Sequence, residues 1–99
     1  MAKNKLPYVI VRAASAGCFA GELLERRSET SVVLRSARRL WYWSGAASLS
    51  QMAMEGVSDP RNCKFPPPVY REEIMGVIEI IDATEAARES IEGVPAWRA

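Results

Sequence analysis

Histidine is absent from this 99-residue sequence, and cysteine occurs only twice. Cys18 and Cys63 lie far apart, without the CxxC or Cys/His spacing of zinc sites and redox motifs. The missing imidazole also removes the commonest general base, and no carboxylate follows a nucleophile at a catalytic spacing. We therefore expect two free thiols, no metal, no cofactor and no catalytic residue, so that the protein is not an enzyme.

Long hydrophobic runs are also lacking, since a membrane-spanning helix needs about 18 consecutive apolar residues. The apolar stretch that follows Lys3 and Lys5 is roughly six residues long, too short for a signal peptide, and it alternates like a strand. We therefore expect a cytoplasmic protein without membrane contact. The hydrophobic fraction of 48% and the charged fraction of 25% are ordinary for a globular protein. We assign residues 1–6 to a frayed N-terminus and residues 7–99 to a single domain.

A large net charge is missing as well, because the chain carries only +1. The charge is nevertheless unevenly distributed along the sequence. Residues 1–43 hold eight basic against three acidic residues, a balance of +5, whereas residues 44–99 hold five against nine, a balance of −4. The two halves can pair within the chain, pair between subunits of a homo-oligomer, or leave one positive face for an anion. The acidic half argues against the continuous basic surface of a nucleic-acid binder.

β-Branched and aromatic residues predict three strands in the first half, at residues 8–13, 18–27 and 31–43. A turn of small residues at 14–17 separates the first two strands, and a polar turn separates the second from the third. Short connections of this kind favour an antiparallel meander. In the third strand, neither alternating face is purely apolar, so we expect it to bend near Ala37 or to extend past the core.

The second half predicts two helices and one further strand. Ser48 and Gln51 form a capping box for a helix at 49–55, which stops at Gly56. Residues 73–81 predict a strand in a central position, because they are apolar on both faces. Thr84 caps a helix at 85–92. The fold class is therefore α+β, a small antiparallel sheet or barrel-like β meander with one inserted helix and one C-terminal helix.

Several segments resemble a family of short phage and prophage proteins of unknown function, and they cover nearly the whole chain. They are YVIVRAASAGCFAGEL, ARRLWYWSGAASLSQMAMEG, NCKFPPPV and VIEIIDATEAARESIEGVPAW, with RRLWYWSGAASLSQ the most specific part. The family has no established activity, so the resemblance implies no catalytic or binding residue. It implies a phage or prophage setting in a bacterial cytoplasm, and it favours a binder or inhibitor of host machinery over an enzyme.

Recognition chemistry is concentrated in residues 38–48. Arginine forks bind phosphate or carboxylate, aromatic rings stack on bases, and a small-residue loop before a helix exposes backbone N–H groups. A second small-residue turn could form the opposite wall of a pocket. We therefore predict a binding site for a small anionic, nucleotide-like ligand, for instance a host-defence signal, made by Arg38, Arg39, Trp41, Tyr42, Ser44, Gly45, Ala46, Ser48, Ser15 and Gly17.

Simpler interpretations of the same residues remain open. Trp41 and Trp43 can be core residues, the two arginines can pair with the acidic half, and the SGAAS segment can be only a capped helix start. Two other functions also remain: a module that binds and inhibits a host or phage protein, and a nucleic-acid binder. If the protein binds a small anionic ligand, we expect a homo-oligomer, because a domain of this size encloses a pocket more easily at a subunit interface.

Overall fold

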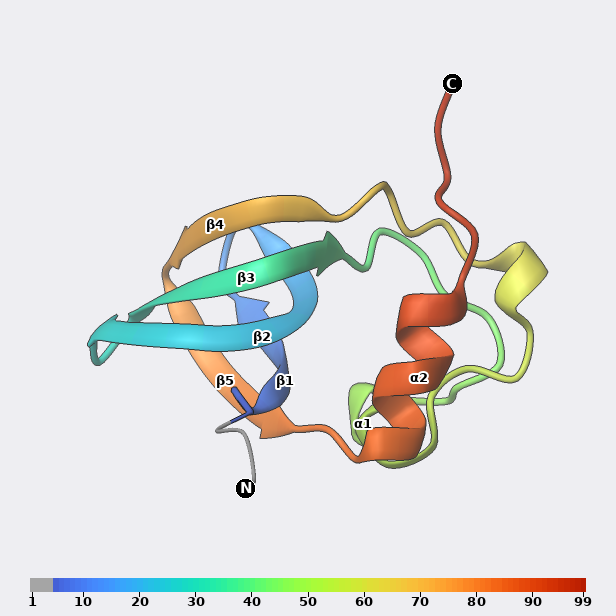
Figure 1. Cartoon of the computed structure of the whole chain (residues 1–99), viewed down its shortest axis with the longest axis horizontal. Helices are drawn as coiled ribbons and strands as arrows, with labels where there is room; N and C mark the ends of the chain where they lie inside the picture. Colours follow the sequence, from blue (N-terminus) through green and yellow to red (C-terminus); the bar gives the residue numbers. More distant parts are fainter. Residues whose placement is uncertain (1–4) are drawn as a thin grey trace.

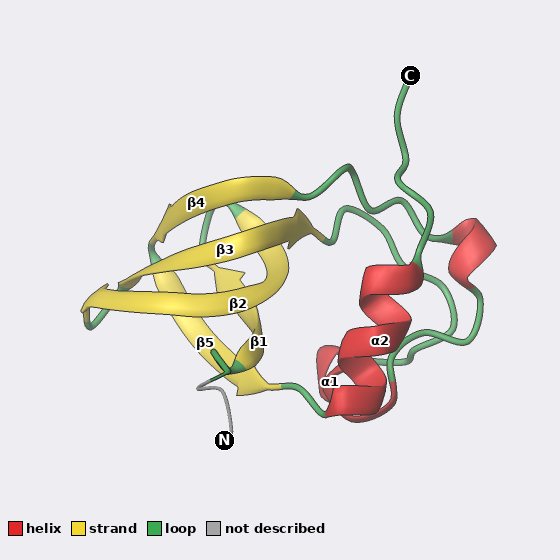
Figure 2. Ribbon diagram, in the orientation of Figure 1, coloured by secondary structure: helices red, strands yellow, loops and turns green. Residues whose placement is uncertain are grey.

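Five antiparallel strands and two α-helices form the protein, which we describe from a computed structural model over residues 5–99 (Figures 1 and 2). The N-terminal segment expected at residues 1–6 therefore lies largely outside the described residues. The α+β class is confirmed, with one helix inserted in the chain and one near its C-terminus. The elements are β1 (Tyr8–Ala13), β2 (Gly17–Ser28), β3 (Ser31–Arg39), α1 (Leu49–Glu55), a 3-10 turn (Pro60–Asn62), β4 (Val69–Met75), β5 (Val77–Asp82) and α2 (Glu85–Gly93).

The strands form one sheet in the order β4-β3-β2-β1-β5. The meander of the first three strands is confirmed. The single central strand expected at 73–81 is wrong, because the chain turns at Gly76, whose φ is 75°, and continues from one edge of the sheet to the other. The two edge strands, β4 and β5, follow each other in the chain, and the sheet is curled (Figure 1). Ile80 and Ile81 are partly buried against the inner and outer hydrophobic clusters, whereas Met75 and Ile78 are 68% and 56% exposed, so the apolar composition of this segment does not mean full burial on both faces.

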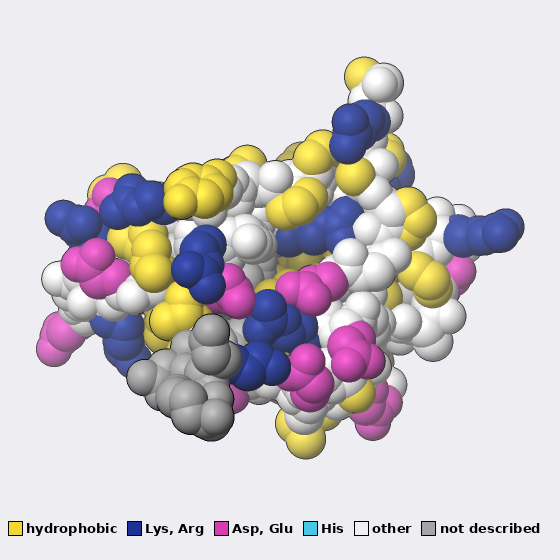
Figure 3. All heavy atoms as spheres, viewed as in Figure 1, with side chains coloured by type: hydrophobic (Ala, Val, Ile, Leu, Met, Phe, Trp, Pro, Cys, Tyr) yellow, Lys and Arg dark blue, Asp and Glu magenta, His cyan; other side chains and the backbone are white. Residues whose placement is uncertain are grey.

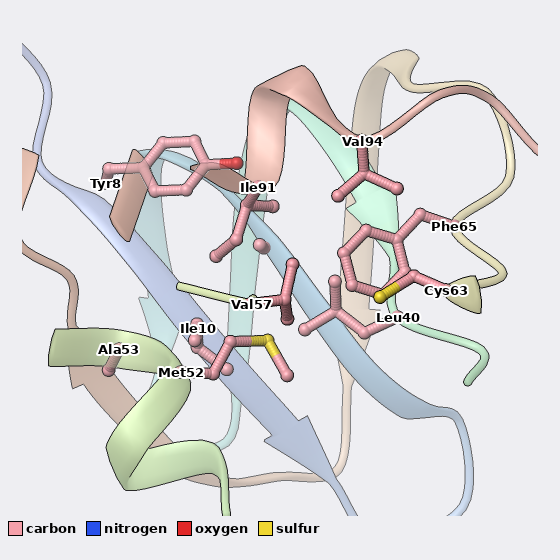
Figure 4. Close-up of a cluster of buried hydrophobic side chains, with 11 residues drawn as sticks. Tyr8, Ile10, Leu40, Met52, Ala53, Val57, Cys63, Phe65, Ile91 and Val94 are labelled. Atoms are coloured by element: carbon pink, nitrogen blue, oxygen red, sulfur yellow. The ribbon is translucent and has the colours of Figure 1, made fainter. Parts of the chain in front are cut away.

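Two hydrophobic clusters lie on opposite faces of the curled sheet. The inner cluster includes Val9, Val11, Phe19 and Leu34, all 0–1% exposed. The outer cluster lies between the sheet and the helices. Figure 4 labels most of its members, which converge from β1, the segment after β3, α1 and the loop after it, α2 and its C-terminal end: Tyr8, Ile10, Leu40, Met52, Ala53, Val57, Cys63, Phe65, Ile91 and Val94. Strand β1 therefore contributes alternate residues to both clusters and joins the barrel-like part to the helical part.

A bulge in β3 changes which face its side chains occupy. Ala20 pairs with Arg38 and Glu22 pairs with Arg35, so Gly21 alone lies opposite Ser36 and Ala37. Ser36 has a φ of 54°, the one positive value among the non-glycine residues of 5–99. The extra residue shifts the alternation, since a one-residue change in register moves following side chains to the other face. The bend expected near Ala37 is thereby confirmed.

Strand β3 is shorter than predicted and ends at Arg39 instead of residue 43. The Leu40 N–H donates to the Cys18 carbonyl at 2.9 Å, close to where β2 begins, so residues 41–43 have no neighbouring β2 strand. Tyr42 makes only an isolated bridge with Lys64. Residues 40–43, which follow β3, consequently extend past the sheet, beside the turn between β1 and β2.

Both helix starts follow their predicted caps. The Ser48 hydroxyl accepts the Gln51 N–H at 3.1 Å, and the Thr84 hydroxyl accepts the Ala87 N–H at 3.0 Å. Gly56 ends α1 with a φ of 79°, in contact with Ser90 of α2, where a Cβ would lie 2.3 Å from the serine Cβ. Within residues 5–99, no helix has the length and hydropathy needed to span a membrane.

Candidate ligand-binding site

An open cavity of about 330 Å³ lies where the end of β3 meets the turn between β1 and β2. It brings together four residues of the predicted site that come from two separate segments: Ser15, Gly17, Arg39 and Trp41. The volume is at the lower end of the range for small-molecule pockets. Ala16 belongs to the small-residue turn that was expected to form the opposite wall, and the remaining lining residues are Cys18, Leu40 and Trp43.

Arg39 supplies the positive charge of this cavity, which we call the Arg39 cavity. Its Nη1 donates to the Ala16 carbonyl at 2.7 Å, its Nη2 lies 3.6 Å from the Glu72 carboxylate, and its Cζ lies 4.6 Å from the centroid of the Phe19 ring. The ion pair with Glu72 confirms, for Arg39, the alternative that these arginines pair with the acidic half of the chain. The contacts hold the guanidinium in place and use only part of its five N–H groups. The side chain remains 41% exposed, so an anion can reach it from solvent.

Aromatic side chains form the opposite part of the lining. Trp41 is 64% exposed, although a tryptophan usually has most of its surface covered. Trp43 is partly buried and packs against the outer hydrophobic cluster. The alternative that both tryptophans are core residues therefore does not hold for Trp41, whose indole is accessible for stacking. Side chains two positions apart in an extended segment point to the same side, so this spacing indicates that Trp43 lies beside Trp41.

The cavity contains a thiol, but its chemistry does not favour nucleophilic attack. Burial raises the pKa of Cys18, and Glu79 raises it further, while Arg12 acts in the opposite direction. A thiol whose pKa lies above its usual value is protonated at neutral pH and is a weak nucleophile. The arrangement of charge, aromatic surface and neutral thiol is suited to holding a ligand.

Arg38, the neighbour of Arg39 in sequence, lies on the other side of the strand and is only 4% exposed. Its Nη1, Nε and Nη2 donate to the carbonyls of Ile91, Pro66 and Phe65 at 2.8, 3.2 and 3.2 Å. Ile91 lies in the last turn of α2, where a cation complements the helix dipole. Burial lowers the pKa of Arg38. The expectation that both arginines share one pocket is corrected, because the bulge and strand alternation direct them apart.

A second hollow, of about 400 Å³, lies over Arg38 between the sheet and α2, where Figure 3 shows basic atoms at the floor of a depression. Tyr8, Ser36 and Glu92 also line it. The carboxylate of Glu92 and the negative end of α2 oppose the binding of an anion there. Arg38 is 4% exposed and donates to three carbonyl groups, whereas Arg39 donates to one carbonyl, pairs with Glu72 and has a side chain 41% exposed. The Arg39 cavity is consequently the better candidate for an anionic ligand.

The predicted cradle of backbone amides before α1 does not belong to either cavity. Internal hydrogen bonds use its groups: the Ala47 N–H donates to Gln51 Oε1 at 2.7 Å, and the Ser44 hydroxyl donates to Asp59 at 2.9 Å. The Gly45 carbonyl accepts the Ser58 N–H at 3.1 Å. The expected contribution of Ser44, Gly45, Ala46 and Ser48 to the same pocket as Arg39 is therefore corrected: this segment anchors α1 to the loop after it.

Tyr42, also predicted for the site, is 52% exposed but does not line the Arg39 cavity. Its backbone pairs with Lys64, whose Nζ lies 5.9 Å from the Tyr42 ring and 5.5 Å from the Trp97 ring. We call these three residues the aromatic–lysine cluster. Alternation after β3 points Tyr42 away from Trp41, so the two rings belong to different surfaces.

Taken together, the fold and the cavity define a small α+β protein with a curled antiparallel sheet and a cationic, aromatic pocket at one end of it. Residues 6–91 match the domain of unknown function DUF6948, so the chain belongs to that family. No curated protein and no solved structure matches the chain.

Proposed function

We propose that the protein is a non-enzymatic binder that captures a small, flat, anionic ligand of nucleotide type in the Arg39 cavity. The observation that carries this proposal is the convergence of the turn at Ser15–Gly17 with Arg39 and Trp41 around one opening. An anchored guanidinium favours a phosphate, since Arg binds phosphates through several parallel hydrogen bonds. An accessible indole favours a base, because stacking contributes about 1–3 kcal/mol per base.

The biological setting is part of the same proposal. RRLWYWSGAASLSQ resembles a segment of phage and prophage proteins, and we place the protein in the cytoplasm of an infected bacterium on that basis. A nucleotide that serves as a host-defence signal is the concrete ligand, because a binder without catalytic groups can act by sequestering such a molecule.

Thermal-shift and calorimetric titration with nucleotides and their uncharged nucleosides tests the proposal. A nucleotide at 100 times its dissociation constant should stabilise the protein by about 2.7 kcal/mol. We expect nucleosides to bind at least tenfold more weakly, because they lack the phosphate that Arg39 would hold. Mono-, di- and cyclic nucleotides should be compared, since the cavity volume of about 330 Å³ favours the smaller ones.

Variants identify the site. Arg39→Ala should abolish the nucleotide-induced shift, and Trp41→Ala should weaken binding roughly tenfold through lost stacking. Arg61→Ala removes an exposed arginine that lines none of the described cavities and should bind like the wild type. The proposal fails if no nucleotide stabilises the protein, or if both cavity variants keep the wild-type response.

A second candidate function is binding of a host or phage protein, which the aromatic–lysine cluster supports. Tyr42 and Trp97 are 52% and 45% exposed on either side of Lys64. Exposed aromatic residues are enriched among those that dominate interface energies. A partner recovered from infected cells should be lost with Tyr42→Ala and kept with Arg39→Ala, which separates this function from ligand capture.

A further inference from the structure

Strand β4 has a free edge that combines exposed hydrophobic residues with charges of both signs. It pairs only with β3, and its other side ends the sheet. Val69, Tyr70 and Met75 are 45%, 84% and 68% exposed. Figure 3 shows hydrophobic and basic side chains at the surface over this strand. Natural proteins usually protect such edges with bulges, prolines or covering loops, so a long, regular, partly apolar edge is a site where another strand can pair.

The charges on β4 are incompletely compensated within the chain. Arg71 pairs directly with Arg35 of β3, and like charges opposite each other destabilise a sheet. The Arg35 guanidinium is bound to Glu22 at 2.8 Å, whereas no carboxylate of residues 5–99 lies within 4 Å of Arg71. Glu73 is bound to Arg27 at 3.2 Å and keeps a side chain 40% exposed. A neighbouring strand with an acidic residue opposite Arg71 would relieve this imbalance.

The sequence of β4 supplies such a neighbour itself. When two copies of Val69–Met75 pair antiparallel about Glu72, Arg71 of each copy lies opposite Glu73 of the other, and Val69 lies opposite Met75. Shifting the pairing by two positions in either direction places Arg71 opposite Arg71 or Glu73 opposite Glu73 of the other copy, and such like-charge pairs are unfavourable. The residues at 69, 71, 73 and 75 share one face of the strand, so both charge pairs and both apolar pairs form on that face.

We propose that the protein forms a two-fold homodimer in which the β4 strands of two copies pair antiparallel in the register centred on Glu72. The interface is isologous, because every contact occurs twice about the axis. At the centre of the interface, Glu72 of one copy lies opposite Glu72 of the other, and this like-charge pair is the least favourable contact of the dimer. Each Glu72 side chain is only 25% exposed and lies 3.6 Å from Arg39 of its own chain, which offsets the repulsion.

Sedimentation velocity of charge-reversal variants tests this register. Arg71→Glu places two acidic residues opposite each other, and Glu73→Arg places two basic residues opposite each other. Each single variant should therefore weaken the dimer at least tenfold, because one substitution acts twice across the axis. A mixture of the two single variants restores both opposite-charge pairs and should form a heterodimer. The double variant Arg71→Glu with Glu73→Arg should dimerise like the wild type.

The outcomes separate the proposal from other assemblies. Arg61→Glu makes the same charge change away from β4 and should leave the dimer intact. Circular dichroism of every variant establishes that it is folded before its mass is interpreted. A monomeric wild type, a dimer that survives both single reversals, or folded single variants that fail to associate when mixed each overturn the register. Nucleotide titration of the monomeric Arg71→Glu variant keeps this test independent of the ligand proposal.

Discussion

Arg38 and Arg39 are adjacent in the sequence and have opposite environments in the fold. Arg38 is 4% exposed, and its nitrogens donate to carbonyls of α2 and of the segment before β4. The side chain of Arg39 is 41% exposed and lies at the opening beside the turn between β1 and β2. Arg38 is enclosed by three carbonyl groups of the protein, whereas Arg39 is bound to one carbonyl and to Glu72 and keeps an exposed face that an external partner can reach.

The difference shows that residue type alone does not separate a structural cation from a binding cation. Both guanidinium groups can bind carbonyl, carboxylate or phosphate oxygens. Their roles diverge because alternation along β3 places them on opposite faces, and the bulge at Ser36 determines which face each one takes. Substitutions in the two regions should consequently differ in kind, with losses of stability on the helix side and losses of binding at the cavity.

The largest expected effect comes from replacing the buried arginine. Arg38→Met keeps much of the side-chain volume and removes the donors to three carbonyls. We expect the free energy of unfolding to fall by about 3 kcal/mol, because buried acceptors lose charged partners. Urea denaturation measures this loss. Arg39→Met is the matched control, and an equal loss in both variants would contradict the difference between the two regions.

Glu22 should have the next largest effect, since it connects β2 to β3 and α2 on the helix side. Its carboxylate accepts from Arg35 and Arg88, each at 2.8 Å. The hydrogen bond from Arg35 is the main cause that lowers the pKa of Glu22, and burial opposes it. Glu22→Gln should cost about 2 kcal/mol at neutral pH, the size of a hydrogen bond to a charged group.

The same interaction predicts a pH dependence. A carboxyl group whose pKa is lowered by folding stabilises the protein above its unfolded value, near 4.5, and loses this contribution as the pH falls through the folded value. The stability difference between wild type and Glu22→Gln should therefore be full at pH 7 and shrink below about pH 4. A difference that stays constant across this range would show that the charge of Glu22 is not responsible.

A smaller effect is expected at the bulge that precedes the two arginines. Ser36 has a φ of 54°, a conformation that glycine adopts without steric cost. Ser36→Gly should stabilise the protein by about 0.5 kcal/mol, since relief of strain slightly exceeds the entropy lost on folding. Ser36→Val should destabilise it by about 1 kcal/mol, because a β-branched residue is poorly accommodated there. Thermal unfolding distinguishes these signs, and a stabilised valine variant would exclude the strained conformation.

The smallest effect on stability should come from Arg39→Ala. Its contacts with Ala16, Phe19 and Glu72 are made by a side chain 41% exposed, so the cost should be below about 0.5 kcal/mol. The same variant should lose the response to nucleotides. A cost close to that of Arg38→Met would instead assign Arg39 to the framework of the fold.

Local signals in the sequence predicted the elements well. The first strand, the α1 boundaries and both helix caps agree with the structure because they depend on neighbouring residues, such as Ser48 with Gln51 and Thr84 with Ala87. The division of residues 69–82 into two edge strands was missed. Apolar composition predicted burial on both faces, but Met75 and Ile78 are exposed at the sheet edges, so composition alone does not distinguish a central strand from an edge strand.

The candidate site was predicted only in part. Ser15, Gly17, Arg39 and Trp41 meet at one cavity, whereas Arg38 lies on the opposite face of the strand. Counting two residues per repeat from the start of β3 assigns Val32 and Arg38 to one face. The bulge at Ser36 reverses this order; the mixed polarity of both faces indicated an irregularity near Ala37, but it did not specify an extra residue at Ser36.

Residue chemistry along the chain thus established the α+β class, the caps, and the concentration of cationic and aromatic groups at residues 38–43. Those features depend on contacts between residues a few positions apart, which sequence spacing encodes directly. Long-range pairing decided which arginine is buried, which tryptophan is accessible and which turn lies beside them. Such contacts join segments more than twenty residues apart, as Arg39 and Ala16 do, and they depend on strand register and on a bulge that only the folded sheet defines.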